Sequence, residues 1–195
     1  VPIGWGSRGV EGMISAISYA RINKIPYLGL CYGMQLAVVE FARNVLKLEN
    51  ANTTEADPKT PYPVIYTNPF QDKMIENRAY GGTMRLGRWE CRVLKKSTAY
   101  EIYKNAGLLS KTDTVFERHR HRYEFNNKYS EKLEKAGLII SGRSVKENLA
   151  EIIELPINVH PFFVGTQFHP EYKSRPLKPH PIFVRFIKTA LSGKI

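Results

Sequence analysis

A cysteine enclosed by glycines is the residue best placed for chemistry. Residues 29–33 read Gly-Leu-Cys-Tyr-Gly, where a short apolar segment ends and a helical pattern begins. Glycines allow a sharp turn, so Cys31 is expected to project above the carboxyl end of a strand, as a nucleophile does in a strand-turn-helix elbow. The helix start would favour the thiolate. A small buried cysteine in a tight turn is the competing interpretation; strand, glycines and helix together favour the nucleophile.

A cysteine nucleophile needs a base, and the base needs a group that orients it. His169 follows the strand-like residues 163–168, and Glu171 lies two positions further on. Side chains two apart in an extended chain project to the same side, so the Glu171 carboxylate can hold the His169 ring. The chain therefore offers a triad of Cys31, His169 and Glu171.

Two further histidines suggest a metal, but their surroundings argue against one. His119 and His121 alternate with three arginines in residues 118–122, and these charges disfavour a dication. The two cysteines, Cys31 and Cys91, have neither metal-ligand nor disulfide-framework spacing. We therefore predict no metal site and a reducing, cytoplasmic setting.

The elements that must position the triad follow from the hydrophobic spacing. Residues 8–23 and 34–48 have helical periodicity, and residues 27–30 between them form a short apolar strand. This order predicts an α/β domain with a parallel sheet. Residues 51–82 are predicted to be loops with a β-like piece at 63–66. Further strands are expected at 89–95, 138–142, 149–155 and 163–168, and helices at 98–105, 129–136 and 181–191.

Length and charge limit the class of protein. A chain of 195 residues without repeats or linkers is read as one domain. Its net charge of +11 suggests an anionic partner, but the stretches 1–50, 51–110, 111–150 and 151–195 carry +2, +3, +3 and +3. This even spread disfavours a nucleic-acid module, and no segment has the pattern of a membrane span or signal peptide. The opening at Val1 suggests that the chain begins inside a domain whose first strand or strands lie upstream.

Two motifs together resemble the class I, triad-type glutamine amidotransferases. They are Gly-x-Cys-x-Gly-Met-Gln at 29–35 and His-Pro-Glu at 169–171. Other stretches resemble the C-terminal glutaminase domain of the CTP synthase family: residues 8–12, 40–45, 49–55, 81–87, 117–124, 174–176 and 180–181. The resemblance implies a flavodoxin-like, three-layer α/β fold with a mostly parallel central sheet flanked by helices. It also implies that residues 1–195 are a glutaminase domain and that the synthetase domain is not in this chain.

The resemblance implies a reaction as well. Cys31 would attack the carboxamide of L-glutamine, and His169 would protonate the departing ammonia and then activate water to hydrolyse the glutamyl thioester. The backbone N–H groups of Ile3 and Tyr32 would bind the oxyanion. Glutamine hydrolysis would need no cofactor. The synthetase domain would use the ammonia, ATP and Mg²⁺ to convert UTP to CTP, activated by GTP, in a homotetramer.

The resemblance also implies which residues form the glutamine pocket. Arg122 would bind the α-carboxylate of glutamine, and Glu55 would bind its α-ammonium group. Without the resemblance, Arg122 would be interpreted as an exposed arginine on a strand and Glu55 as a solvated carboxylate in a loop. The implied substrate-binding set is Gly4, Tyr32, Gly33, Met34, Gln35, Glu55 and Arg122. The loop departs from the family at Ile3, where a glycine is usual, and its β-branched side chain predicts a remodelled oxyanion hole. Arg85 is a candidate phosphate contact.

Two other functions remain open at this point. A stand-alone hydrolase of γ-glutamyl amides would use the same triad without nucleotide synthesis. A basic nucleotide- or nucleic-acid-binding module with a vestigial triad is the alternative from a different class, and Ile3 in the oxyanion loop would be compatible with it.

Overall fold

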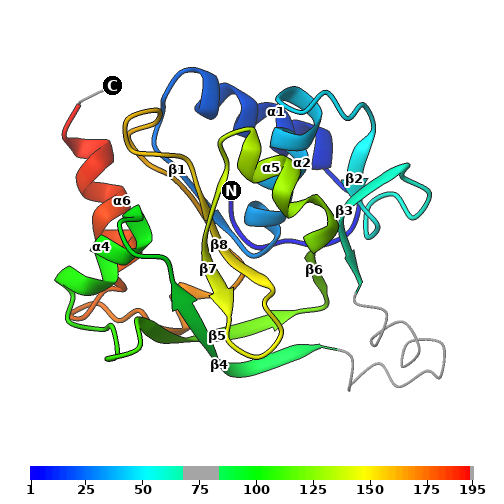
Figure 1. Cartoon of the computed structure of the whole chain (residues 1–195). Coiled ribbons are helices and arrows are strands. Elements are labelled where there is room, and N and C mark those ends of the chain that lie inside the picture. The colour runs from blue at the N-terminus through cyan, green and yellow to red at the C-terminus, as the bar shows by residue number, and fades with distance from the viewer. Residues whose placement is uncertain (68–83, 194–195) are drawn as a thin grey trace.

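A six-stranded sheet forms the middle of the molecule, with helices on both faces (Figure 1). The computed structural model describes residues 1–67 and 84–193. The elements in chain order are α1 (Val10–Ile22), β1 (Tyr27–Leu30), α2 (Tyr32–Asn44), β2 (Ala51–Thr53), β3 (Tyr62–Thr67), β4 (Arg85–Val93), α4 (Thr98–Asn105), β5 (Thr114–His121), β6 (Tyr123–Phe125), α5 (Ser130–Lys135), β7 (Ile139–Ser144), β8 (Ala150–Glu154), β9 (Phe163–Thr166) and α6 (Pro181–Leu191).

The sheet is mixed, not mostly parallel as predicted. Its strand order is β1-β9-β8-β7-β4-β5, and β1 with β9 is the parallel pair among the described strands of this sheet. The other neighbours pair antiparallel. Five residues separate β7 from β8 and eight separate β8 from β9, whereas a parallel crossover needs a dozen or more. A second sheet has the order β2-β3-β6.

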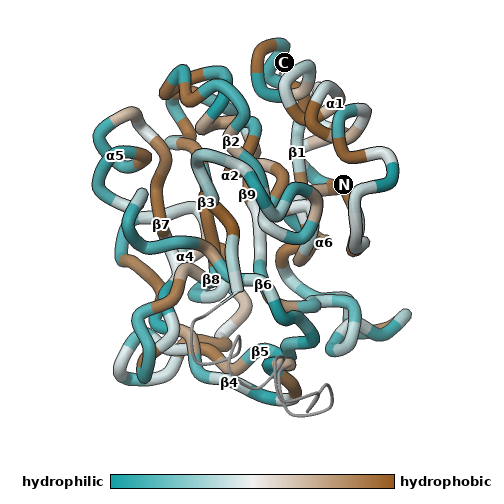
Figure 2. Tube along the Cα trace, turned by 90° about the vertical axis from the view of Figure 1, so that its right-hand side faces the viewer, coloured by the Kyte–Doolittle hydropathy of each residue, from teal (hydrophilic) through white to brown (hydrophobic). Residues whose placement is uncertain are grey.

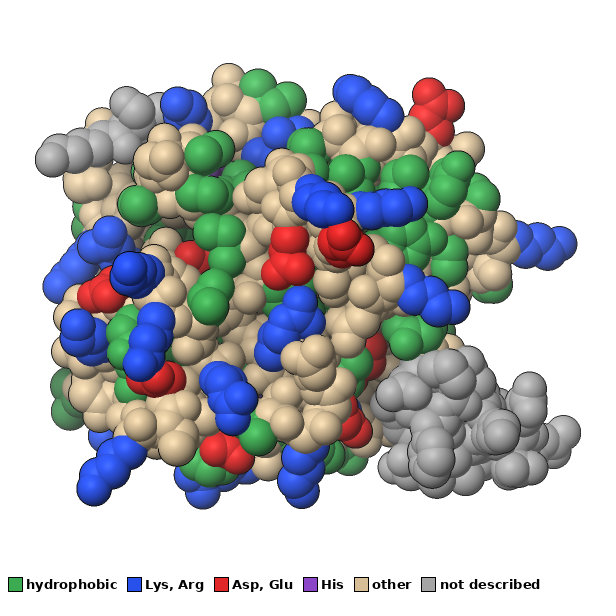
Figure 3. Space-filling model, in the orientation of Figure 1, with side chains coloured by type: hydrophobic (Ala, Val, Ile, Leu, Met, Phe, Trp, Pro, Cys, Tyr) green, Lys and Arg blue, Asp and Glu red, His purple; other side chains and the backbone are tan. Residues whose placement is uncertain are grey.

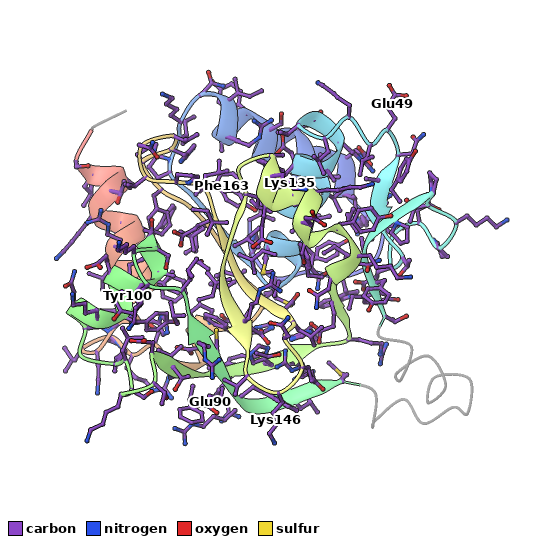
Figure 4. The ribbon with its side chains drawn as sticks, in the orientation of Figure 1. Glu49, Glu90, Tyr100, Lys135, Lys146 and Phe163 are labelled. Atoms are coloured by element: carbon purple, nitrogen blue, oxygen red, sulfur yellow. The ribbon has the colours of Figure 1, made fainter. Side chains whose placement is uncertain are left out.

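Two hydrophobic cores fill the spaces between the layers, and the predicted three-layer α/β architecture is confirmed. Ile17 of α1 and Met34 of α2 lie in the core that contains Phe163 of β9. On the other face of the sheet, Tyr103 of α4 and Ile182 of α6 lie in the second core. Figure 4 shows Phe163 in the middle of the molecule and Tyr100 on α4 toward one side. Hydrophobic stretches gather along the inner strands in Figure 2.

Most predicted elements are present, and the exceptions have physical reasons. The helices α4 and α6 have the predicted bounds, while α2 begins two residues earlier and ends four residues earlier than predicted. The strands β2, β5 and β6 were not predicted as elements. In β5 the buried positions include Glu117, His119 and His121, so the strand lacks the apolar alternation that normally reveals one.

Positive charge is dispersed over the surface, in keeping with its even spread along the chain. Figure 3 shows Lys and Arg side chains scattered across one face, with acidic groups among them and no single basic stripe. Among the described residues, no helix is long and apolar enough to cross a membrane.

Candidate active site

Cys31 lies at the sharp turn between β1 and α2, as its spacing predicts. Its backbone has φ 50° and ψ −99°, a conformation that only glycine adopts readily. Close packing requires the neighbouring glycines: a Cβ on Gly29 would lie 2.8 Å from the carbonyl carbon of Gly33, and one on Gly33 would overlap the carbonyl oxygen of Val1. That oxygen accepts a hydrogen bond from the Leu30 N–H at 3.1 Å, so the N-terminal segment lies directly against the turn.

The Cys31 thiol is buried, with 7% of its surface exposed. Burial raises the pKa of the thiol to about 12, and the backbone N–H of Tyr32 at the start of α2 opposes this shift. Three nearby carboxylates raise the pKa further: Glu55, Glu124 and Glu171. The helix start alone therefore does not yield the predicted thiolate, because burial has the larger effect. The thiol is neutral near pH 7 and needs a base to remove its proton.

His169 is a suitable base. Its Nδ1 lies 2.6 Å from Oε1 of Glu171, its ring stacks on Tyr172 with centroids 4.8 Å apart, and its backbone N–H donates to the carbonyl of Arg118. Because a carboxylate only accepts, Nδ1 carries the proton and Nε2 holds the lone pair. Nε2 is buried and has no hydrogen-bond partner among the described residues, so it is available to accept a proton.

The loop predicted to hold the oxyanion is fastened over the start of α2. The Gly6 N–H donates to Oε1 of Glu55 at 3.0 Å, and the Tyr32 hydroxyl donates to the Gly6 carbonyl. A Cβ on Gly4 would lie 3.1 Å from the Tyr32 ring, so Gly4 allows this close approach. The Ile3 side chain is 43% exposed and is not part of the core. The loop thus brings Gly4 and Tyr32 of the predicted set together.

Glu55 and Arg122 interact in the folded chain. Burial is the largest influence on Glu55 and raises its pKa, while the charge of Arg122 and the Gly6 N–H counteract it. The structure therefore brings the two predicted substrate-binding charges into one region. Met34 is different, because its side chain is fully buried in the core and a Cβ on Gly165 would lie 3.0 Å from it. Only the Met34 backbone can line a pocket.

A second amide, Gln167, was missed by sequence reasoning. Nε2 of Gln35 donates to the Tyr123 carbonyl at 3.0 Å and to Oε1 of Gln167 at 3.2 Å. Nε2 of Gln167 in turn donates to Sγ of Cys31 at 3.6 Å. The available signal was a glutamine inside the strand-like run 163–168, two residues before His169.

The histidine pair is a buried hydrogen-bonded unit. Nδ1 of His119 lies 2.8 Å from Nε2 of His121, and Nδ1 of His121 lies 3.1 Å from the Tyr123 carbonyl. Since a carbonyl only accepts, Nδ1 of His121 carries a proton, and with both rings neutral Nδ1 of His119 donates to Nε2 of His121. Burial lowers the pKa of His121 to about 3. The described residues contain no group of three or more metal-binding side chains.

Arg85 is buried near this pair, and its charge lowers the pKa of both histidines. It is therefore not placed for the surface phosphate contact that the sequence suggested. It is 5% exposed, and Nη1 donates to Oε1 of Glu151. Oε2 of Glu151 lies 3.5 Å from Nε2 of His119. Burial raises the pKa of Glu151 to about 7, against the charge of Arg85. Neither His119 Nε2 nor Glu151 Oε2 has a hydrogen-bond partner among the described residues. Residues 81–83, which precede Arg85 in a predicted family block, lie outside the described residues.

The comparison with protein families decides the affiliation. The family model described as "Glutamine amidotransferase class-I" matches residues 1–189. The chain belongs to the class-I glutamine amidotransferases. Within this family, the amidotransferase chain is similar to the solved structure "Trypanosoma brucei CTPS - glutaminase domain with bound acivicin", with 36% identity and a TM-score of 0.87. That match covers 100% of this chain and 71% of the other.

Curated relatives of this amidotransferase are considerably longer. A CTP synthase from Caldanaerobacter subterraneus subsp. tengcongensis is 59% identical over 195 residues, which is 100% of this chain and 34% of the relative. A CTP synthase from Clostridium kluyveri is 51% identical over 194 residues, again with 100% and 34% coverage. The chain thus spans about a third of the length of these relatives.

Proposed function

We propose that residues 1–195 form the glutaminase domain of a CTP synthase and hydrolyse L-glutamine with Cys31, His169 and Glu171. The observation that carries this proposal is the hydrogen bond of 2.6 Å between His169 Nδ1 and Glu171. It leaves Nε2 of this buried histidine without a partner in the part of the chain that the structure describes, in the domain whose elbow presents Cys31. The family membership and the match to a glutaminase domain support the same reaction.

The proposed reaction starts from the neutral thiol. Nε2 of His169 takes the proton from Cys31 as the sulfur attacks the carboxamide carbon of glutamine. The Tyr32 N–H at the start of α2, with the N–H of Ile3, binds the oxyanion. His169 then returns its proton to the nitrogen, and ammonia leaves from a glutamyl thioester. Water activated by His169 releases glutamate. Glu171 keeps the ring in the required tautomer and stabilises its protonated form.

Glutamine selection rests on its zwitterionic end. Glu55 and Arg122 offer opposite charges in a half-buried setting, suited to an α-ammonium and an α-carboxylate. Backbone groups of Gly4, Gly33 and Met34 complete the pocket. A substrate lacking one charge would leave a partly buried partner unpaired, which is costly.

The proposal also covers the longer protein of which this chain would be one domain. A synthetase domain would receive the ammonia and use ATP with Mg²⁺ to convert UTP to CTP, with GTP as activator, in a cytoplasmic homotetramer. The glutaminase half-reaction needs no cofactor in this scheme, and the ATP and Mg²⁺ would be held by synthetase residues that are not in this chain.

The test uses a chloroketone analogue of glutamine, followed by peptide mapping and a glutamate-release assay. We expect label on Cys31 that excess glutamine prevents, and no label on Cys91, which is also buried. Cys31→Ala should lose both label and turnover. Absence of label on Cys31 in folded protein would refute the triad. Glutamate release without glutamine-dependent CTP formation by the longer protein would instead favour the stand-alone hydrolase.

A further inference from the structure

Gln167 is a buried side chain that the proposed triad mechanism does not use. It follows β9 directly, has no exposed surface, and its backbone N–H donates to the Glu151 carbonyl at 2.8 Å. Its amide nitrogen donates to the Cys31 sulfur at 3.6 Å, and its amide oxygen accepts from Gln35. A buried amide in this position carries a desolvation cost unless both of its ends are bonded.

The orientation of both amides follows from a single backbone carbonyl. The Tyr123 carbonyl is only an acceptor, so the group of Gln35 that faces it at 3.0 Å must be the NH₂. The second hydrogen of that NH₂ points to Gln167, which must therefore present its oxygen there. The Gln167 NH₂ is then left facing Cys31. The relay from Tyr123 through Gln35 thus aims a hydrogen-bond donor at the reacting sulfur.

We propose that Gln167 is a catalytic residue that donates a hydrogen bond to the Cys31 thiolate formed during turnover, and that Gln35 holds it in this orientation. This inference rests on the proposed role of Cys31 as nucleophile. The buried sulfur has to become negative in a region containing Glu55, Glu124 and Glu171, all of which oppose its ionisation. Tyr32 supplies one backbone N–H to the sulfur, and Gln167 supplies a second donor from another element.

The test measures alkylation of Cys31 by iodoacetamide as a function of pH. Iodoacetamide reports the thiolate and needs no glutamine pocket, so failure of this inference can be separated from failure of the proposed glutaminase reaction. Gln167→Met removes the donor with little change in volume. Donors to charged groups are typically worth a factor of ten or more in such an equilibrium, so we expect alkylation about tenfold slower at each pH below the thiol pKa.

Cys91 is the internal control, because it is buried in the core on the other face of the sheet. Its alkylation should be the same in Gln167→Met and wild type, which shows that the fold is intact. Gln35→Met is the second variant; it leaves the Gln167 amide in place but free to turn, and we expect a two- to fivefold slower reaction at Cys31. An unchanged Cys31 rate in both variants, or equal changes at Cys31 and Cys91, would overturn the proposal.

Discussion

The packing of Gly33 leads to a prediction that joins the fold to the reaction. Gly33 is the second residue of α2, where alanine normally stabilises a helix by about 0.5–1 kcal/mol over glycine. Here a Cβ would overlap the carbonyl oxygen of Val1 and lie 3.1 Å from its carbonyl carbon. The obstacle is backbone, which cannot rotate away, so the N-terminal segment must shift.

The change in stability on replacing Gly33 by alanine is the difference between the clash with Val1 and the gain in helix propensity. Overpacking of this kind costs roughly 1–3 kcal/mol, which exceeds the helix-propensity gain. In a domain of this size, each kcal/mol lowers Tm by about 2–4 °C. The larger consequence is for turnover, because the shifted segment carries Ile3 of the proposed oxyanion hole. Losing one such donor typically costs about 10²–10³ in kcat.

Gly33→Ala is therefore expected to lower both Tm and kcat, with kcat falling at least a hundredfold in a glutamate-release assay. Gly12→Ala is the matched control: it also lies in a helix, and a Cβ there meets no atom within 4 Å. We expect the control to raise Tm slightly and leave kcat unchanged. A Gly33→Ala enzyme that retains wild-type Tm and kcat within threefold would refute the reasoning.

Three further substitutions test the surrounding contacts. Glu55→Gln keeps an acceptor for the Gly6 N–H but loses the charge for the ammonium group, so KM for glutamine should rise about tenfold or more, whereas KM for glutaramate, which lacks the amino group, should not change. Tyr32→Phe removes the hydroxyl that holds the Gly6 carbonyl and should cost about 0.5–1.5 kcal/mol in thermal or urea unfolding; unchanged stability would contradict this contact. The pKa of Glu151 is raised from 4.5 to about 7 in the fold, so Glu151 contributes stability that is present below about pH 4.5 and lost as the pH rises through 7. The free energy of unfolding of wild type relative to Glu151→Gln should therefore fall by about 3 kcal/mol over that interval, and a flat difference in urea unfolding would contradict the shift.

The candidate site was more predictable than the sheet that carries it. Cys31, His169 and Glu171 could be selected because a nucleophile, its base and its orienting group leave local signals: glycines around one and a two-residue spacing between the others. The residues of β7 and β8 carry no such signal of whether the two strands run parallel or antiparallel. It depends on connection length, and two short connections make the neighbouring strands antiparallel.

Other parts of the site depend on backbone groups that a sequence does not display. The roles of Gln35 and Gln167 follow from where the Tyr123 carbonyl points, and the tautomer of His121 follows from the same carbonyl. The thiol pKa was misjudged for a related reason: proximity to a helix start is visible in the sequence, whereas the extent of burial that outweighs it is a property of the packed domain.

The backbone conformation of Cys31 places the reactive residue in conflict with the stability of its own domain. A non-glycine residue at φ 50° and ψ −99° costs of order 1–3 kcal/mol, and glycine at that position would remove the strain. Selection for a well-folded domain alone would thus favour loss of the nucleophile. A homologous sequence with glycine at this turn would be a domain that kept its architecture, gained stability and gave up covalent catalysis.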